Sequence, residues 1–188
     1  MPEAYREEHP FEILGGRMVS MSPRPAINHN RIAGNIYRIF SLFLKGKSCE
    51  AFGDGVDLFL SEEDHFIPDG MVVCDKNKIR SNYISGAPDL VVEVLSPRTA
   101  RNDRWHKKNA YETAGVTEYW IVDGANKTVE VYLLKEGSYY LDNAYSLLPD
   151  YLLEQMTEKQ AEEVAAEFKC HLFDGLVIRL EDIFDRVL

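Results

Sequence analysis

The sequence contains few cysteines and no long apolar run. Its three cysteines, Cys49, Cys74 and Cys170, are far apart and odd in number, which indicates neither a disulfide framework nor a CxxC-type zinc site. We therefore expect three reduced thiols. No apolar stretch approaches the roughly 18–20 residues that span a bilayer. The polar, acidic residues 1–8 do not have the pattern of a signal peptide. Together these absences predict a cytoplasmic protein that does not enter a membrane.

Positive charge is also scarce, since 21 Lys and Arg stand against 31 Asp and Glu, for a net charge of −10. A general nucleic-acid coat protein needs basic surface, so this balance argues against that class. The charge is unevenly spread, however. Residues 98–108 contain five basic residues against Asp103 alone, whereas residues 150–188 contain ten acids against four bases. This asymmetry is more informative than the net charge.

The chain of 188 residues, 45% of them hydrophobic, suits a single domain over residues 1–188 with a sizeable core. Paired glycines at 15 and 16 predict a hairpin turn, and apolar residues at helical spacing predict a helix over 28–44. One mixed sheet flanked by helices, an α/β arrangement, accommodates all the expected elements. Strands are predicted at 11–14, 17–21, 49–53, 56–60, 69–74, 89–95, 118–122, 128–134, 138–141 and 176–180, and further helices at 99–113 and 154–168.

Glu93 lies among aliphatic residues in the predicted strand 89–95, Asp-Leu-Val-Val-Glu-Val-Leu. Aliphatic residues on both faces predict a strand that is covered on both sides. An ionised carboxylate there costs several kcal/mol unless a cation or strong donors meet it. Glu93 could be a strand-end residue held by a structural arginine, but we favour a metal ligand or general base.

Asp69 is the second candidate carboxylate. It follows a proline at the mouth of strand 69–74, and if that strand neighbours 89–95, Asp69 and Glu93 meet at one edge of the sheet. Alone, Asp69 would be interpreted as a strand-entry turn residue. Paired oxygen donors with open water positions suit Mg²⁺ or Mn²⁺ and not zinc. Asp89 also follows a proline, but it lies ~13 Å along the strand from Glu93, too far to share an ion, and is interpreted as structural.

The predicted helix 99–113 carries basic residues at i, i+3 intervals, which would place them on one face. Such a charge run is often only a solvated helix surface. Lys107, however, lies four residues before Tyr111, which with Ala114 marks the buried side, so Lys107 is predicted to lean over the carboxylate pair. Lys108 is the alternative, and the arginines are expected to face outward, towards phosphates. The basic residues are Arg98, Arg101, Arg104, Lys107 and Lys108.

A carboxylate pair, a divalent ion and a lysine suit the hydrolysis of phosphodiester bonds. The ion lowers the pKa of a bound water and neutralises charge on the phosphate, while the lysine orients the attacking hydroxide or stabilises the developing oxyanion. Positive charge beside the site would hold a polyanionic substrate. The predicted catalytic residues are Asp69, Glu93 and Lys107, with Asp69 and Glu93 as the metal ligands.

The sequence also resembles the Uma-two family of restriction endonucleases, which belongs to the PD-(D/E)XK nuclease superfamily. The resemblance covers most of the chain, and its specific block is 87–123. It implies a restriction-endonuclease-like fold with a central mixed β-sheet flanked by helices, and a Mg²⁺- or Mn²⁺-dependent endonuclease that acts on DNA. It also implies Asp69 and Glu93 as metal ligands. The matching motifs are Pro68-Asp69, Pro88-Asp-Leu-Val-Val-Glu-Val-Leu-Ser-Pro97, Asp103-Arg-x-x-Lys107 and Tyr111-x-x-x-Gly-Val-x-Glu-Tyr-Trp-Ile-Val-Asp123.

The match departs from the superfamily's plain motif at Leu95, where that motif has lysine. In families of this type the lysine migrates to the adjacent helix, and Lys107 is the matching residue. Arg17 stands where relatives often carry an acid in the second hairpin strand, which bears on full activity if that acid helps to bind metal. Glu12 and His29 match family positions, but Glu12 can equally be a strand residue and His29 a helix-start cap.

Three functions follow from these observations. The preferred one is a DNA endonuclease that depends on Mg²⁺ or Mn²⁺. The second is a nuclease-fold protein that binds nucleic acid or a protein partner without cutting, which the negative charge and Arg17 favour modestly. The third is a structural or regulatory homodimer that uses helix 154–168, although the apolar stripe of that helix fits intramolecular packing better. The stripe consists of Leu153, Met156, Val164 and Phe168.

Overall fold

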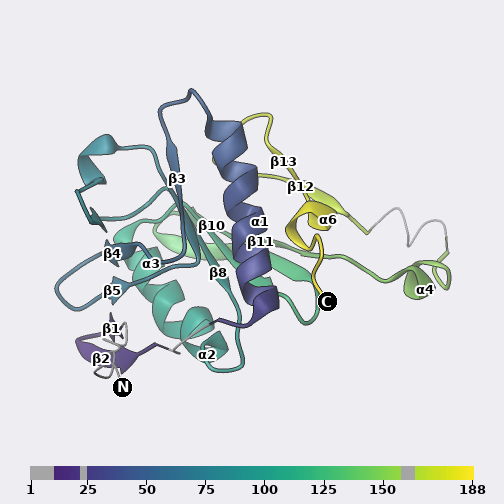
Figure 1. The fold of residues 1–188 in the computed structure, drawn as a ribbon, viewed down its shortest axis with the longest axis horizontal. Helices are drawn as coiled ribbons and strands as arrows, with labels where there is room; N and C mark the ends of the chain where they lie inside the picture. Colours follow the sequence, from purple (N-terminus) through teal and green to yellow (C-terminus); the bar gives the residue numbers. More distant parts are fainter. Residues whose placement is uncertain (1–10, 22–24, 158–163) are drawn as a thin grey trace, which may run out of the picture.

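The computed structural model describes residues 11–21, 25–157 and 164–188. At its centre is a six-stranded mixed sheet in the order β11-β10-β9-β8-β6-β3, with helix α1 lying across one face (Figure 1). Helix α3 and a five-stranded sheet, β2-β1-β5-β4-β7, pack against the other face. The predicted central mixed sheet flanked by helices is therefore confirmed, whereas the second sheet was not predicted.

The elements of the structure agree with the sequence pattern over much of residues 11–146, apart from the short strands at 65–66 and 83–85, which were not predicted. The helix predicted over 154–168 does not agree, because its described part is a turn and a strand. In chain order the elements are β1 (Phe11–Leu14), β2 (Arg17–Ser20), α1 (Ile27–Leu44), β3 (Glu50–Gly53), β4 (Asp57–Phe59), β5 (His65–Phe66), β6 (Gly70–Val73), the 3₁₀ turn η1 (Lys76–Lys78), β7 (Tyr83–Ser85), β8 (Leu90–Val94), α2 (Ala100–Asn102), the π-helical turn η2 (Asp103–Lys107), α3 (Lys108–Ala114), β9 (Glu118–Asp123), β10 (Thr128–Lys135), β11 (Ser138–Ser146), α4 (Asp150–Leu153), β12 (Glu167–Lys169), β13 (Val177–Arg179) and α6 (Leu180–Ile183).

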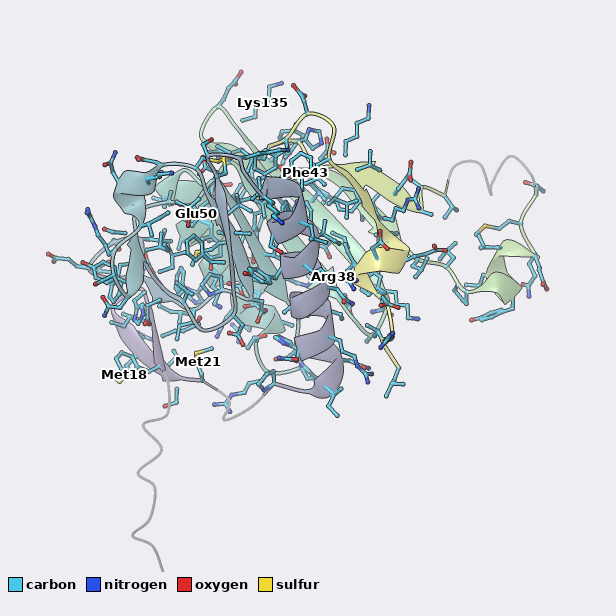
Figure 2. The ribbon with its side chains drawn as sticks, turned by 45° about the horizontal axis from the view of Figure 1, so that its top comes forward. Met18, Met21, Arg38, Phe43, Glu50 and Lys135 are labelled. Atoms are coloured by element: carbon cyan, nitrogen blue, oxygen red, sulfur yellow. A yellow bond between two sulfur atoms is a disulfide. The ribbon has the colours of Figure 1, made fainter. Side chains whose placement is uncertain are left out.

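Apolar side chains fill the layer between α1 and the central sheet (Figure 2). Ile32, Ile36 and Phe40 recur at helical spacing and form the buried face of α1. The ring of Phe40 lies 5.4 Å from that of Trp120 in β9. This packing fixes the start of α1, and with it His29, near the mouth of the central strands.

The N-terminal hairpin is confirmed. Gly15 and Gly16 adopt φ angles of 56° and 75°, the left-handed conformations that a tight two-residue hairpin turn requires. In β1 the side chains alternate, so that Glu12 and Leu14 are buried. The hairpin therefore presents a carboxylate to the interior of the molecule.

Strand β8 carries Glu93 and is buried at every residue. It pairs antiparallel with β6 and parallel with β9. The register between β6 and β8 pairs Gly70 with Val92, and its continuation by one residue places Asp69 opposite Glu93. Because directly opposite residues of an antiparallel pair point to the same face, this register predicts that the two carboxylates lie near each other at the start of β6.

The helix predicted over 99–113 is confirmed as the succession of α2, η2 and α3, and it ends at Gly115, whose φ is 90°. Within the π-helical turn, Asp103 and Lys107 are buried, whereas the three residues between them are exposed. The arginines face outward and Lys107 faces inward, so the prediction that all five basic residues share one face is wrong. Single π-helical turns are rare and occur frequently at functional sites.

The helix predicted over 154–168 is not found in the described part of that segment. Helix α4 ends at Leu153, β12 occupies Glu167–Lys169, and residues 158–163 lie outside the described residues. Phe168 is buried in the main core between two exposed neighbours, which is the alternating pattern of a strand. The spacing of the apolar residues in this segment also fits a helix, and for that reason a helix was predicted. The dimer contact assigned to this helix therefore loses its basis.

The prediction of three reduced cysteines is wrong. Cys49 and Cys74 form a disulfide, because the β3–β6 register that pairs Glu50 with Val73 places them opposite each other. Cys170 is a free, buried thiol. The cysteines therefore no longer support a cytoplasmic location. Within the described ranges, no helix is both long enough and apolar enough to cross a bilayer.

Candidate active site

Lys107 is enclosed by three carboxylates. Its Nζ lies 2.8 Å from Oε1 of Glu12 in β1 and 3.0 Å from Oε1 of Glu93 in β8. It also lies 3.8 Å from Oδ1 of Asp103, one helical turn earlier. All four side chains are almost completely buried. The hairpin, the central sheet and the helix meet at this point, and the predicted contact between Lys107 and the acid of β8 is present.

Tyr111 and Asp103 complete this inner cluster, and neither was predicted as a site residue. The hydroxyl of Tyr111 donates a 2.7 Å hydrogen bond to Oε1 of Glu93, the oxygen that Lys107 also contacts. Oδ1 of Asp103 is buried and accepts no hydrogen bond from any described residue. Both residues lie four positions from Lys107, a helical spacing that brings side chains together and that would have identified them.

Asp69 and His29 form the outer part of the site. Oδ2 of Asp69 accepts a 2.7 Å hydrogen bond from the backbone N–H of Val94 and lies 3.4 Å from Nε2 of His29. The side chains of His29 and Asp69 are 16% and 12% exposed, against 4% for Lys107 and Glu93. His29 and Asp69 are therefore more accessible to solvent than the inner cluster is. His29 makes no cap hydrogen bond at the start of α1, so the cap interpretation is wrong.

Burial and charge together set the protonation of these groups. Burial raises the pKa of Glu93 well above its usual value, although the attraction of Lys107 opposes this. Burial also raises the pKa of Asp103, to about 6. For Lys107, burial acts to lower the pKa, but the three carboxylates raise it above its usual value. These carboxylates favour the charged form of Lys107 in the metal-free protein. Burial and the charge of Glu93 raise the pKa of Tyr111 well above its usual value, so its hydroxyl stays a donor.

Opposing effects also act on the pKa of His29. Burial acts to lower its pKa, but the hydrogen bond and the negative charge of Asp69 raise it above its usual value. Asp54, in the turn after β3, belongs to the same neighbourhood, since burial and the charge of Asp69 raise its pKa while His29 and Lys107 oppose the rise. Its Gly-Asp-Gly context is typical of an ordinary turn, so the sequence did not connect Asp54 with the site.

The oxygen donors suit a hard divalent cation. Oδ2 of Asp69 accepts a hydrogen bond from Val94, and Oε1 of Glu93 accepts hydrogen bonds from both Lys107 and Tyr111. Around these oxygens, carboxylates outnumber the single ammonium of Lys107, which favours a further cation. No group of three or more His, Cys, Asp or Glu among the described residues could hold a metal ion. Asp69 and Glu93 would have to bind the ion together with water, as Mg²⁺ commonly does.

The remaining candidates lie outside this cluster. Asp89 is structural, as predicted, because its Oδ2 accepts a 2.7 Å hydrogen bond from a backbone N–H at the end of β6. Lys108 instead lies over the ring of Tyr132, 3.8 Å from the centroid. Arg17 is exposed on β2, and Leu95 is half-buried directly after β8.

Comparisons with known proteins identify the family of this chain and some of its relatives. The Uma2 family profile, described as "Putative restriction endonuclease", matches residues 2–167. The chain is 31% identical over 125 residues to the uncharacterized protein sll1609 of Synechocystis sp., covering 64% of this chain and 70% of that protein. It is 29% identical over 132 residues to slr1290 of the same organism, covering 69% and 68%.

One solved structure extends the comparison to the fold. A crystal structure described as "a putative nuclease belonging to DUF820" from Anabaena variabilis superimposes with a TM-score of 0.65. The superposition covers 100% of this chain and 95% of the other, at 20% sequence identity. The restriction-endonuclease-like fold is thereby confirmed.

Proposed function

Because this chain belongs to the Uma2 family, whose profile covers residues 2–167, we propose that it is an endonuclease that hydrolyses phosphodiester bonds of DNA with a bound Mg²⁺ or Mn²⁺. Membership in a family of restriction-endonuclease type supports nuclease activity in general. The proposed catalytic residues are Asp69, Glu93 and Lys107, and the proposed metal ligands are Asp69 and Glu93.

The contact that carries the proposal is the one between Lys107 and Glu93, 3.0 Å apart in the interior. A buried ion pair is weak support for stability as such, because desolvation can exceed the Coulombic gain. Here one ammonium faces three carboxylates, and Asp69 adds a fourth opposite Glu93. Such an excess of buried carboxylates over cations supports a site that binds a divalent cation.

Each side chain has a definite part in this proposal. Oε1 of Glu93 accepts hydrogen bonds from Lys107 and Tyr111, which orients the carboxylate, and Oε2 would be the oxygen that binds the metal. A bound divalent ion would lower the pKa of a coordinated water and neutralise charge on the phosphate. In its charged form, Lys107 would stabilise the negative charge that develops on the phosphate oxygens and would not act as a general base.

The same burial favours a second candidate, a nuclease-fold protein that binds nucleic acid or a protein partner without cutting. Glu93 and Lys107 are each only 3% exposed. In addition, Glu12 of the hairpin already contacts the ammonium group of Lys107, which a phosphate would need to contact. Furthermore, Leu95 stands where the superfamily's plain motif has lysine, and Arg17 stands where relatives often carry an acid. Under this candidate the cluster holds the hairpin to the body and performs no chemistry.

Plasmid cleavage separates the two candidates. Supercoiled DNA incubated with the wild-type protein and Mg²⁺ or Mn²⁺ should be nicked or linearised, and Glu93→Gln should abolish this. Glu50→Gln is the matched control, because Glu50 is exposed on β3 at the edge of the central sheet (Figure 2). Circular dichroism would verify that each variant is folded. Cleavage that survives in Glu93→Gln, or no cleavage by wild type with either ion, would reject the endonuclease.

A further inference from the structure

We propose that the outer surface of the helix that carries Lys107 docks a single-stranded segment of nucleic acid, with an unpaired base stacked on Trp105. We call this the Trp105 surface, and it consists of Arg98, Arg101, Trp105 and His106, all of them exposed. The inference deepens the proposed function, because it places an unpaired strand beside the proposed nuclease site.

Trp105 is unusually exposed for so large an aromatic side chain. It is 66% exposed, whereas the only other tryptophan, Trp120, is fully buried and donates a hydrogen bond to Glu118. Among the described residues, the ring of Trp105 has no aromatic or cation–π partner. In the π-helical turn, the side chain of Lys107 faces the interior and that of Trp105 faces solvent. An exposed tryptophan beside a buried functional cluster is typical of a binding surface.

The charge around Trp105 indicates the kind of partner. The chain as a whole has a net charge of −10, yet Arg98 and Arg101 lie in the same exposed stretch as Trp105. Lys107 of that segment is buried among carboxylates and does not contribute to this surface. Arg101 and His106 form no ion pair within the described ranges. Arg98 donates to a backbone carbonyl on β2 and so keeps its charge, while Arg104 is paired with Glu130. Positive charge around an exposed aromatic ring suits phosphates and bases more than an apolar protein surface.

The distances allow one strand to reach both Trp105 and the inner cluster. A helix with its side chains is about 10–12 Å across, so a strand that passes around it from the outer Trp105 to the inner Lys107 covers about 16–19 Å. About five or six stacked nucleotides span that path at about 3.4 Å each. A base can stack on the indole only if its own face is free, which is the case in a single strand and not inside a duplex.

Tryptophan fluorescence tests this inference without any cleavage. The protein with EDTA is titrated with an oligothymidylate and, separately, with a hairpin duplex of equal length. Trp120 is buried, so quenching by acrylamide reports on Trp105. We expect the single strand to change the emission of Trp105, to protect it from acrylamide, and to bind more tightly than the duplex does.

Variants complete the test through fluorescence anisotropy of a labelled single strand. Trp105→Ala should weaken binding by about 5- to 150-fold, since one stacked base contributes ~1–3 kcal/mol, and Trp105→Phe should retain most of it. Tyr151→Ala is the matched control, because Tyr151 on α4 is 61% exposed. Arg101→Gln should reduce the salt dependence of the affinity by about 0.7 in log–log slope.

Two outcomes would overturn the inference: unchanged affinity in Trp105→Ala, or duplex binding as tight as single-strand binding with no response of Trp105. Both are independent of the plasmid assay. If wild type cuts no DNA yet Trp105 responds to the single strand, the docking surface stands and the endonuclease fails. If wild type cuts DNA and Trp105→Ala binds and cuts normally, the endonuclease stands and the docking surface fails.

Discussion

Replacing Asp103 by asparagine should stabilise the metal-free protein, and the gain should grow as the pH rises. Asp103 is 1% exposed, its Oδ1 accepts no hydrogen bond from the described chain, and burial raises its pKa from 3.8 to about 6. A carboxyl group with a higher pKa in the folded state binds its proton more tightly there, so its ionisation destabilises the fold as the pH rises from about 4 to about 6. Asparagine has a similar shape and does not ionise.

The shift of about 2 pKa units corresponds to about 3 kcal/mol, at ~1.4 kcal/mol per unit. We therefore expect Asp103→Asn to raise the free energy of unfolding by about 3 kcal/mol at pH 8 but only by about 1 kcal/mol at pH 4.5. Urea unfolding with EDTA at several pH values measures this. Asp174→Asn removes the same charge from an exposed loop and should change little. A gain independent of pH, or a loss at pH 8, would refute the reasoning.

Three further predictions use the same cluster and the disulfide. Tyr111→Phe removes the donor to Glu93 and should lower the free energy of unfolding by about 1.5–3 kcal/mol; an unchanged urea midpoint would contradict this. Lys107→Met leaves three buried carboxylates without their cation, so it should cost about 3–5 kcal/mol and abolish plasmid cleavage; a fully active variant would exclude a catalytic role. Reducing the Cys49–Cys74 disulfide, which spans 25 residues, should cost about 2–4 kcal/mol. Thiol titration of the unfolded, unreduced protein should find Cys170 alone; three reactive thiols would contradict the disulfide.

Local patterns predicted much of the fold. The Gly15–Gly16 pair identified the hairpin because a tight turn needs left-handed backbone, and the aliphatic run around Glu93 identified a strand covered on both faces. Lys107 was predicted from its helical spacing to Tyr111. Each of these inferences depends on residues within one turn or one strand, where chain geometry alone determines which side chains are neighbours.

Contacts between distant segments were harder to predict. Glu12 meets Lys107 only because a second sheet folds over the helix, and nothing in the hairpin sequence specifies that partner. Cys49 and Cys74 are opposite each other because of a strand register that no local pattern encodes. The region 154–168 was misinterpreted because apolar residues spaced for a helix there become, in part, an alternating strand around Phe168.

The central claim is that Asp69 and Glu93 share one divalent cation. Isothermal calorimetry of Mn²⁺ binding to wild type, Asp69→Asn and Asp89→Asn at pH 7.5 tests it most directly. Asp69 and Asp89 both follow proline, but only Asp69 continues the β6–β8 register to the position of Glu93, while Asp89 accepts a hydrogen bond from the backbone at the end of β6. We predict one Mn²⁺ per chain for wild type and Asp89→Asn, and binding at least about tenfold weaker for Asp69→Asn, a loss of ~1.4 kcal/mol or more. No binding by wild type, or equal binding by all three proteins, would contradict the claim.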